Sequence, residues 1–202
     1  MDVLDFGCGD GSLTAQFLPR VRSLTLADRS SQMLELAKDN MDLRWGSRVR
    51  FVEADVTTAT NLGTFDVILC VGVLAHVRSV SETLDSITGQ LAPGGRCVLQ
   101  ITDSGRMIES LLHAHARLKL RRGGDAGYLT NRMSAEEIQS ALESRGLQLQ
   151  AARNYSLLLP GMGPLPSPLK GALQRASWTR PRLSRHASEA IMLFRAPTPS
   201  AE

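Results

Sequence analysis

Val3-Leu4-Asp5-Phe6-Gly7-Cys8-Gly9-Asp10-Gly11 is the stretch that decides the fold of this 202-residue chain. Its first four residues, three of them apolar, predict a short buried strand that ends at Gly7. Apolar residues at 13, 17 and 18 then recur at helical spacing. Glycines let the backbone turn sharply, and the start of a helix offers free N–H groups to a ligand. The stretch therefore predicts a ligand-binding loop, with a tight turn that binds nothing as the alternative.

The spacing of the glycines separates two classes of ligand. A dinucleotide-binding loop has the pattern G-x-G-x-x-G, and this chain has Ser12 where the third glycine would stand. Asp5 ends the strand, where its carboxylate would repel a pyrophosphate and attract an ammonium group. The loop is therefore expected to bind a nucleoside that carries an amino acid, and a nicotinamide-dependent oxidoreductase is disfavoured.

Short apolar runs alternate with helical patterns over the first hundred residues. We expect strands at Leu24–Ala27, Val49–Val52, Phe65–Val71 and Arg96–Ile101, the last after a tight turn at Pro93-Gly94-Gly95, and helices after Ser30-Ser31 and over roughly Ser79–Leu91. The first of these helices would turn Met33, Leu34 and Ala37 toward the core. Such alternation predicts a parallel sheet with helices on both faces, and Phe65–Val71 is expected to be its central strand.

The second half of the chain is less regular. We expect a helix over Met107–Leu120 that ends at Gly123-Gly124, a helix from Ser134 to Gly146, and strands at Leu147–Gln150 and Ala190–Phe194. Ser134 and Glu137 have the spacing of a capping box. Residues 160–168 contain four prolines and two glycines and predict a loop. The whole chain, residues 1–202, is expected to be one domain, with a ligand-binding half at 1–103, a second half at 104–196 and a frayed tail at 197–202.

Two further aspartates follow the second and third expected strands. Asp28 could accept hydrogen bonds from both hydroxyls of a ribose, and Asp55 could accept one from an adenine amino group. Ligands of open parallel sheets bind where the strands end. Three carboxylates at three successive strand ends, with the glycine loop at the first, therefore predict one binding site.

These segments together resemble class I, Rossmann-like S-adenosylmethionine-dependent methyltransferases of the small-molecule type. Asp5–Gly11 looks like their first motif, Asp28–Leu34 is similar to the second (often D-x-S-x-x-M-L), and Glu53–Asp55 to the third. Phe65–Val77 resembles the fourth-strand segment, and Leu91–Gly95 the turn before the fifth strand. The resemblance is continuous from residue 2 to about residue 103, and beyond that only the order of elements matches.

The resemblance implies a doubly wound α/β fold, a mostly parallel seven-stranded sheet with an antiparallel last strand, and S-adenosylmethionine as the cofactor. The loop from Gly7 to Gly11 would hold the methionine part. Asp28 would bind the ribose, with Arg29 and Met33 beside the adenine. The backbone near Cys70 would face the methionine amine. The cofactor-binding residues implied in this way are Asp5, Gly7, Cys8, Gly9, Gly11, Asp28, Arg29, Met33, Asp55, Val56 and Cys70.

Members of this family usually carry helices ahead of the first strand, and these N-terminal helices are missing from this chain, which begins two residues before the strand. We therefore expect either a shortened form or a lid supplied by a partner or by the second half of the chain. The expected function is methyl transfer to a small acceptor, amphipathic or anionic. The alternative is a non-catalytic or partner-dependent protein that binds S-adenosylmethionine without its lid.

His76 is the one candidate for a catalytic base, because it follows the fourth strand and imidazole titrates near neutral pH. The alternative is that His76 only packs or caps at the start of the next helix. His113 and His115 are two residues apart on a helical pattern, so they point to different faces and no metal site is expected. Cys8 and Cys70 are expected to be buried thiols and not nucleophiles.

Charge and composition bear on partners and location. Residues 1–104 carry nine Lys and Arg against 13 Asp and Glu, whereas residues 105–202 carry 14 against seven. The segment 157–187 mixes apolar and basic residues, which suits an amphipathic acceptor or peripheral contact with a membrane; an ordinary surface insertion is the alternative. The Asn/Asp-Pro-Pro-aromatic motif of base-amino methyltransferases is absent, so nucleic acid is a less favoured partner. Three scattered cysteines, no secretory leader and no membrane span predict a cytoplasmic location, and the oligomeric state is left open.

Overall fold

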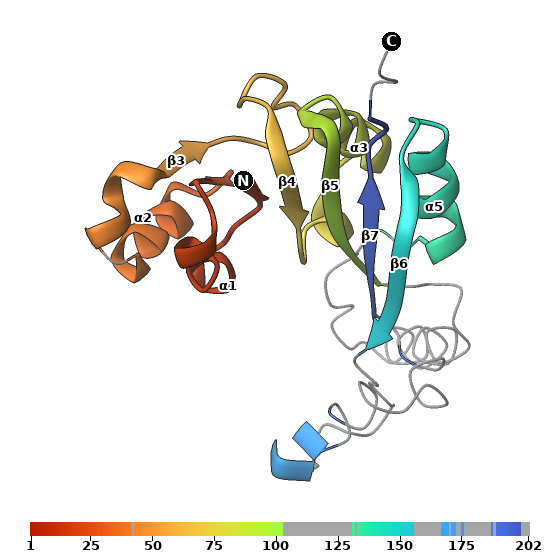
Figure 1. Cartoon of the computed structure of the whole chain (residues 1–202). Coiled ribbons are helices and arrows are strands. Elements are labelled where there is room, and N and C mark those ends of the chain that lie inside the picture. The colour runs from red at the N-terminus through yellow and green to blue at the C-terminus, as the bar shows by residue number, and fades with distance from the viewer. Residues whose placement is uncertain are drawn as a thin grey trace.

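A seven-stranded sheet forms the centre of the computed structural model, which describes residues 1–41, 43–102, 131, 133–155, 167–169, 171–172, 175, 187 and 189–198. The strands are β1 (Asp2–Phe6), β2 (Ser23–Asp28), β3 (Val49–Glu53), β4 (Phe65–Cys70), β5 (Leu91–Thr102), β6 (Gln148–Tyr155) and β7 (Glu189–Arg195). Their order is β3-β2-β1-β4-β5-β7-β6, with β4 in the middle as predicted (Figure 1). The pairs from β3 to β5 are parallel, and β7 is antiparallel to both of its neighbours. The predicted fold class is confirmed.

Helices cover both faces of this sheet (Figure 1). They are α1 (Ser12–Ala15), α2 (Ser31–Asn40), α3 (Val80–Thr88) and α5 (Ala135–Glu143), with 3₁₀ turns η1 (Leu18–Arg20), η2 (Leu43–Arg48) and η3 (Leu74–His76). Side chains of α3 and α5 pack with those of β1, β4, β5 and β7 in one cluster, and side chains of α2 and η1 pack with those of β1 and β2 in another. Since successive residues of a strand point to opposite faces, β1 contributes Leu4 to the first cluster and Val3 to the second.

Serine side chains begin three of the helices at the positions expected from the sequence. Ser30 accepts a hydrogen bond from the backbone N–H of Met33, and Ser79 accepts one from that of Glu82. At α5 the capping box is complete, because Ser134 accepts from the Glu137 N–H and the Glu137 side chain accepts from the Ser134 N–H. Each cap satisfies N–H groups that the first turn of a helix cannot pair internally.

The first two helices differ from the predicted apolar faces. Leu13 and Phe17 are 43% and 42% exposed, and α1 already ends at Ala15. On α2, Leu34 and Ala37 are buried as predicted, but Met33 is 40% exposed and the expectation for it was wrong. A residue directly before Leu34 is rotated by about 100° around the helix, so it leaves the buried face.

Several boundaries also shift. The turn at Pro93-Gly94-Gly95 lies inside β5 as an irregularity, because Phe65 pairs with Leu91 whereas Val67 pairs with Arg96. β6 extends to Tyr155, and α5 ends at Glu143 rather than Gly146. The Gly94 N–H donates to the carbonyl of Pro197 (3.0 Å), so the tail expected to fray from residue 197 is still attached there.

Some predicted features lie outside the described residues. These are the helix at 107–120 with His113 and His115, the glycine pair at 123–124, and most of the loop at 160–168 and of the segment 157–187. Ten of the 14 Lys and Arg residues of the second half also lie outside the described residues.

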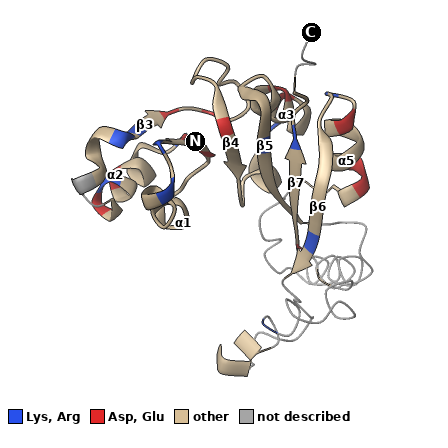
Figure 2. Cartoon of the chain, in the orientation of Figure 1, with Lys and Arg blue, Asp and Glu red and all other residues tan. Residues whose placement is uncertain are grey.

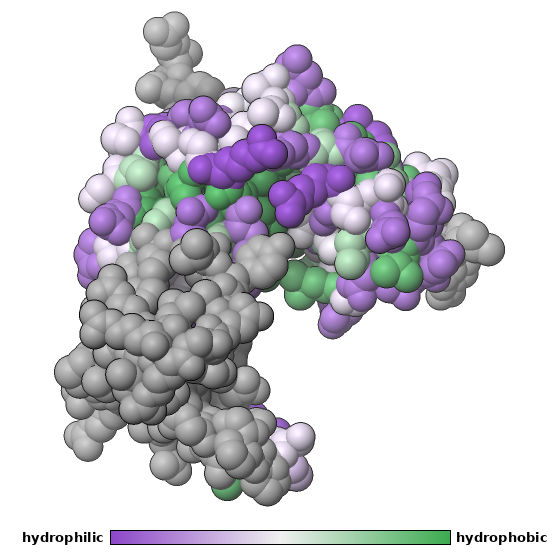
Figure 3. Space-filling model, turned by 180° about the vertical axis from the view of Figure 1, so that it is seen from behind, coloured by the Kyte–Doolittle hydropathy of each residue, from purple (hydrophilic) through white to green (hydrophobic). Residues whose placement is uncertain are grey.

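The described surface is mixed in character. Figure 2 shows acidic residues on α5, whose first turn contains Glu136 and Glu137. Seen from behind, hydrophilic side chains cover much of the described face, and apolar side chains lie between them (Figure 3). Among the helices of the described part, none is both long and apolar enough to cross a membrane.

Candidate functional site

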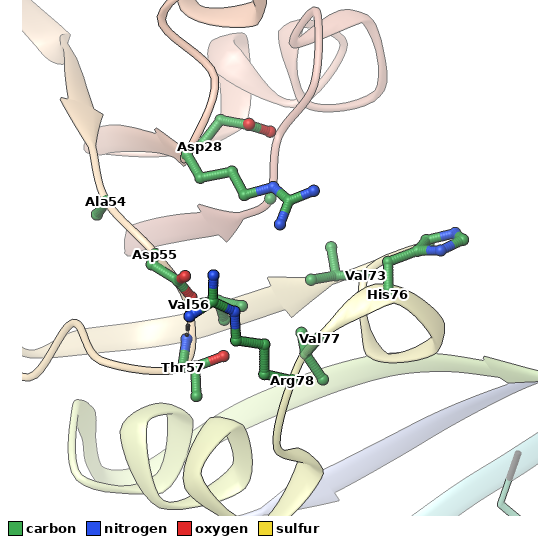
Figure 4. A pocket seen from close by; sticks show the side chains of 12 residues that line it. Asp28, Ala54, Asp55, Val56, Thr57, Val73, His76, Val77 and Arg78 are labelled. Carbon is green, nitrogen blue, oxygen red and sulfur yellow. Dashed lines mark hydrogen bonds between the residues drawn. The ribbon is translucent and has the colours of Figure 1, made fainter. Parts of the chain in front are cut away.

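A cavity of about 380 Å³ opens where β1, β2, β3 and β4 end. It is lined by Gly7, Asp28, Arg29, Ala54, Asp55, Val56, Thr57, Gly72, Val73, His76, Val77 and Arg78 (Figure 4). Every one of these residues ends a strand or follows one, because the carboxyl ends of parallel strands meet at one edge of the sheet. The strand order reverses between β1 and β4, which is where open α/β sheets bind ligands.

The glycine loop passes close to the opposite wall of the cavity. A Cβ on Gly7 would lie 2.2 Å from Cγ2 of Val73, and Gly7 has a φ of +78° that favours glycine. The N–H groups of Gly7 and Cys8 both donate to the carbonyl of Ala27, at 2.7 and 3.1 Å. The glycine at position 7 therefore lets β1 and the β4 loop approach each other around the cavity.

Asp28 joins the glycine loop to the end of β2. Its Oδ2 accepts a hydrogen bond from the Gly9 N–H (2.9 Å) and its Oδ1 accepts one from the Ser30 N–H (2.9 Å). Asp28 was expected to accept hydrogen bonds from both ribose hydroxyls, and both of its oxygens already accept one from the backbone. A carboxylate oxygen can accept more than one hydrogen bond, so the fixed side chain still has capacity for ligand hydroxyls.

Asp55 and Val56 form the wall below β3. The Asp55 Oδ1 accepts from the Thr57 N–H at 2.8 Å, the dashed line of Figure 4. The Asp55 carbonyl accepts from the N–H groups of Thr58 and Ala59. Val56 is buried and contributes to the core that includes α3. The turn after β3 is thus held by its own hydrogen bonds and presents Asp55 and Thr57 together.

Asp5 does not line the cavity. It is only 2% exposed, and its Oδ2 accepts a hydrogen bond from the Thr14 hydroxyl at 2.9 Å. Burial raises the pKa of Asp5 to about 6, the hydrogen bond from Thr14 opposes this rise, and the charge of Asp28 adds to it. The hydrogen bond between Thr14 and Asp5 thus links α1 to β1 beneath the glycine loop.

The three cysteines are buried and none of them lines the cavity. Burial raises the pKa of the Cys8 and Cys70 thiols to about 12 and that of Cys97 well above its usual value. A thiolate is the nucleophilic form of cysteine, and these thiols stay protonated at neutral pH. The expectation that Cys8 and Cys70 are buried thiols is confirmed.

The structure brings together half of the residues that the sequence singled out. Those that line the cavity are Gly7, Asp28, Arg29, Asp55, Val56 and His76. Those that do not are Asp5, Cys8, Gly9, Gly11, Met33 and Cys70. Sequence reasoning missed Ala54, Thr57, Gly72, Val73, Val77 and Arg78 as lining residues. Their position in the chain could have identified them, since all six follow the ends of β3 and β4.

His76 ends the 3₁₀ turn η3 at the wall of the cavity. Its N–H donates to the Val73 carbonyl at 2.8 Å, and Asn131 fixes the turn from outside by donating to the carbonyls of Leu74 and Val77. In Figure 4 the imidazole of His76 points away from the carboxylates of Asp28 and Asp55. The arrangement separates the histidine from the end of the cavity that holds the two aspartates.

Two arginines balance the two carboxylates of the cavity. Within the part of the chain that the structure describes, neither Arg29 nor Arg78 forms an ion pair or a side-chain hydrogen bond. No group of three or more His, Cys, Asp or Glu side chains suited to a metal ion is found among the described residues. The cavity offers hydrogen-bond acceptors and donors around a partly apolar wall, which suits a nucleoside-sized ligand.

Comparison with known proteins gives one family. A family model described as a methyltransferase domain matches residues 1–152. Over 100 residues the chain is 34% identical to a ubiquinone biosynthesis O-methyltransferase of Psychrobacter cryohalolentis, covering 48% of this chain and 39% of that protein. It is 33% identical over 112 residues to the mitochondrial ubiquinone biosynthesis O-methyltransferase of Schizosaccharomyces pombe, covering 54% and 40%. The matches thus span about two fifths of the length of these relatives.

Solved structures share the fold at low sequence identity. The magnesium protoporphyrin IX methyltransferase of Synechocystis, solved with bound S-adenosyl-L-homocysteine, superposes with a TM-score of 0.68 at 17% identity. The superposition covers 96% of this chain and 73% of that chain.

Proposed function

The chain belongs to the methyltransferase-domain family, and from this premise we propose that it binds S-adenosylmethionine in the cavity and transfers the methyl group to a hydroxyl of a small acceptor. The observation that carries the proposal is the cavity itself, in which Asp28, Asp55 and Gly7 meet at the ends of three parallel strands. The names of the relatives, ubiquinone biosynthesis O-methyltransferases, support a ring hydroxyl as the acceptor group. They also favour catalysis over the non-catalytic alternative.

The residues of the cavity fit this cofactor. Asp28, oriented by two backbone N–H groups, would accept hydrogen bonds from the ribose hydroxyls. Asp55 and Val56 would hold the adenine edge, with Arg29 beside the ring. Gly7 leaves room for the methionine part, and a Cβ at Gly9 would meet nothing within 4 Å, so the loop is open on that side. When bound, the cofactor supplies an activated methyl group on a sulfonium.

The chain's own contribution would be to position the reactants and to exclude water. Methyl transfer from a sulfonium has a good leaving group, so orientation accounts for much of the acceleration. A base is needed only if the acceptor loses a proton.

We further propose one domain over residues 1–202 and a cytoplasmic location, the latter supported by the three free cysteines. Membrane contact through 157–187 stays a prediction.

Calorimetry with S-adenosylmethionine, S-adenosylhomocysteine and a nicotinamide dinucleotide tests the proposed cofactor. We expect binding of the first two only. Asp28→Ala removes a charged acceptor, and each charged hydrogen bond contributes about 1.5–3 kcal/mol, so affinity should fall about tenfold or more. Asp28→Asn, which keeps one acceptor oxygen, should lose less, and Asp39→Ala on the exposed side of α2 should bind like wild type.

Two results would contradict the proposal. Equal affinity of folded Asp28→Ala and wild-type protein would remove Asp28 from the site. Preference for the dinucleotide would exclude the cofactor. Transfer of label from methyl-labelled S-adenosylmethionine to compounds in a cell extract would then distinguish an active enzyme from a protein that only binds the cofactor.

A further inference from the structure

A second polar cluster lies at the carboxyl end of β5, outside the lining of the cavity. It consists of Gln100 on β5, Glu189 on β7 and Tyr155 on β6. The Gln100 amide donates to Oε2 of Glu189 at 2.7 Å, and Tyr155 lies directly opposite Glu189 on the neighbouring strand. All three side chains are partly buried. A carboxylate that accepts a hydrogen bond from a neighbouring strand has a preferred orientation.

The register of the strands brings these three side chains to one face. Glu189 pairs with Thr102 of β5 on one side and with Tyr155 of β6 on the other. Residues directly opposite each other in a sheet project to the same face, and Gln100 precedes Thr102 by two residues, so it projects there too. The cluster is therefore a consequence of the sheet and not of a chance surface contact.

Gly72 connects this cluster to the cavity. It lines the cavity, and a Cβ at Gly72 would lie 4.0 Å from Oε1 of Gln100. Because β5, β7 and β6 lie on one side of β4, and β1, β2 and β3 on the other, the cluster is across β4 from Asp28 and Asp55 (Figure 1). If the two aspartates hold the nucleoside, Glu189 lies beyond the opposite end of the cavity, where an acceptor would approach.

We propose that Glu189 is the general base that takes the proton of the acceptor hydroxyl, and that Gln100 and Tyr155 position its carboxylate. The inference rests on the proposed function. As the acceptor oxygen forms a bond to the methyl carbon, the carbon–sulfur bond breaks and its electron pair stays on sulfur. The hydroxyl proton moves to Glu189 and then to water. The products are a methyl ether, S-adenosylhomocysteine and one proton.

The surroundings of Glu189 suit this role. A carboxylate has acceptor positions beyond the one that the Gln100 amide occupies, so a ligand hydroxyl can be added. Burial raises the pKa of Tyr155, and the neighbouring Glu189 carboxylate raises it further. The phenol therefore remains protonated at neutral pH. Thr102, which lies opposite Glu189, carries no charge. His76 is then part of the cavity wall, which is the alternative that the sequence left open.

A coloured phenol gives a test that does not depend on turnover. Nitrocatechol changes its absorption when it ionises. In wild-type protein with bound S-adenosylhomocysteine, the Glu189 carboxylate should oppose a second negative charge beside it, so we expect bound nitrocatechol to be half ionised at a higher pH than the free probe. Glu189→Gln should remove this shift, whereas Glu189→Asp should retain part of it. Glu143→Gln, an exposed glutamate on α5, should behave like wild type.

Turnover gives the second measurement, with catechol as the acceptor. Glu189→Gln should lower kcat about 10²-fold or more and leave the Kd for S-adenosylhomocysteine unchanged. Gln100→Leu should lower kcat less and leave the KM for catechol nearly unchanged. Thermal unfolding checks that each variant is folded.

The outcomes separate this inference from the proposed function. Absence of S-adenosylhomocysteine binding in wild-type protein would reject the cofactor itself. An ionisation midpoint of bound nitrocatechol that is the same in wild type and in Glu189→Gln would overturn the role of Glu189. A midpoint that moves in His76→Gln and stays fixed in Glu189→Gln would assign the base to His76 and overturn it as well.

Discussion

Gly7 is the residue at which the cavity tolerates least change. A Cβ there would approach Val73 to 2.2 Å and would have to adopt a φ of +78°. We expect Gly7→Ala to lower the affinity for S-adenosylmethionine severely and to destabilise the fold by about 1–3 kcal/mol, from overpacking and backbone strain. Calorimetry and urea unfolding measure the two effects.

Gly9→Ala is the matched control for this substitution. Gly9 also has a positive φ, of +54°, but its Cβ position is open. The Gly9→Ala variant should therefore show the loss of stability that backbone strain alone causes, without a clash of the new Cβ. Removing the obstructing methyl groups in the double variant Gly7→Ala/Val73→Ala should restore part of the affinity. A Gly7→Ala variant no weaker than Gly9→Ala would mean that the β4 loop moves aside freely.

At the level of single residues, the sequence predicted those positions whose chemistry is tied to a strand end. Asp28 and Asp55 were found because a carboxylate after a short apolar run is recognisable. Arg78 and Gly72 were missed, because they line the cavity only through the path of the chain after β4, which no local pattern encodes. Asp5 was assigned to the ligand, but its burial under α1 depends on packing.

At the level of elements, local hydrogen bonds were predicted more accurately than burial. The capping box of α5 was found to the residue, because Ser134 and Glu137 satisfy each other within one turn. The exposure of Met33 and the early end of α1 could not be read from apolar spacing, since spacing shows which residues share a face and not how much of that face the sheet covers.

The turn η3 is an element held by a distant residue. The side-chain amide of Asn131 donates to the carbonyls of Leu74 and Val77. Its backbone N–H donates to the carbonyl of Ala75. Asn131→Ala should leave two carbonyls without these partners, which costs about 1–3 kcal/mol in stability. Because the turn bears part of the cavity wall, the affinity for S-adenosylhomocysteine should fall several-fold.

Urea unfolding and calorimetry check this expectation. Asn61→Ala replaces an exposed asparagine and serves as the control. If Asn131→Ala loses stability but keeps its affinity, η3 holds its shape without the asparagine, and the wall of the cavity depends on β4 alone.

At the level of the whole molecule, the two groups of residues to which we assign a role lie on opposite sides of β4. Asp28, Asp55 and the glycine loop follow β1, β2 and β3, whereas the Gln100–Glu189–Tyr155 cluster belongs to β5, β6 and β7. The parallel half could be predicted as far as residue 102, because each strand is local in sequence. The antiparallel last strand was expected only from the family resemblance, and its position between β5 and β6 was not predicted, since contacts between residues about 90 apart leave no local pattern.

Asp5 links the buried core to the pH dependence of the stability of the whole fold. Burial raises its pKa from 3.8 to about 6, so the folded protein holds this proton at pH values where the unfolded chain has released it. Its contribution to the free energy of unfolding is therefore fully present below about pH 4 and is lost as the pH rises through about 6. The difference amounts to about 3 kcal/mol. Asp2, whose pKa is lowered by its hydrogen bonds to Arg22 and Ser23, acts in the opposite direction.

Asp5→Asn isolates this effect, because the amide oxygen can still accept the hydrogen bond from Thr14 and carries no charge at any pH. We expect the variant to gain stability relative to wild type as the pH rises from about 4 to about 7, by up to about 3 kcal/mol, measured by urea unfolding at each pH. Asp39→Asn, on the exposed side of α2, should give a curve parallel to wild type. A parallel curve for Asp5→Asn as well would mean that Asp5 ionises in the folded protein as it does in the unfolded chain, and that the space between β1 and α1 admits water.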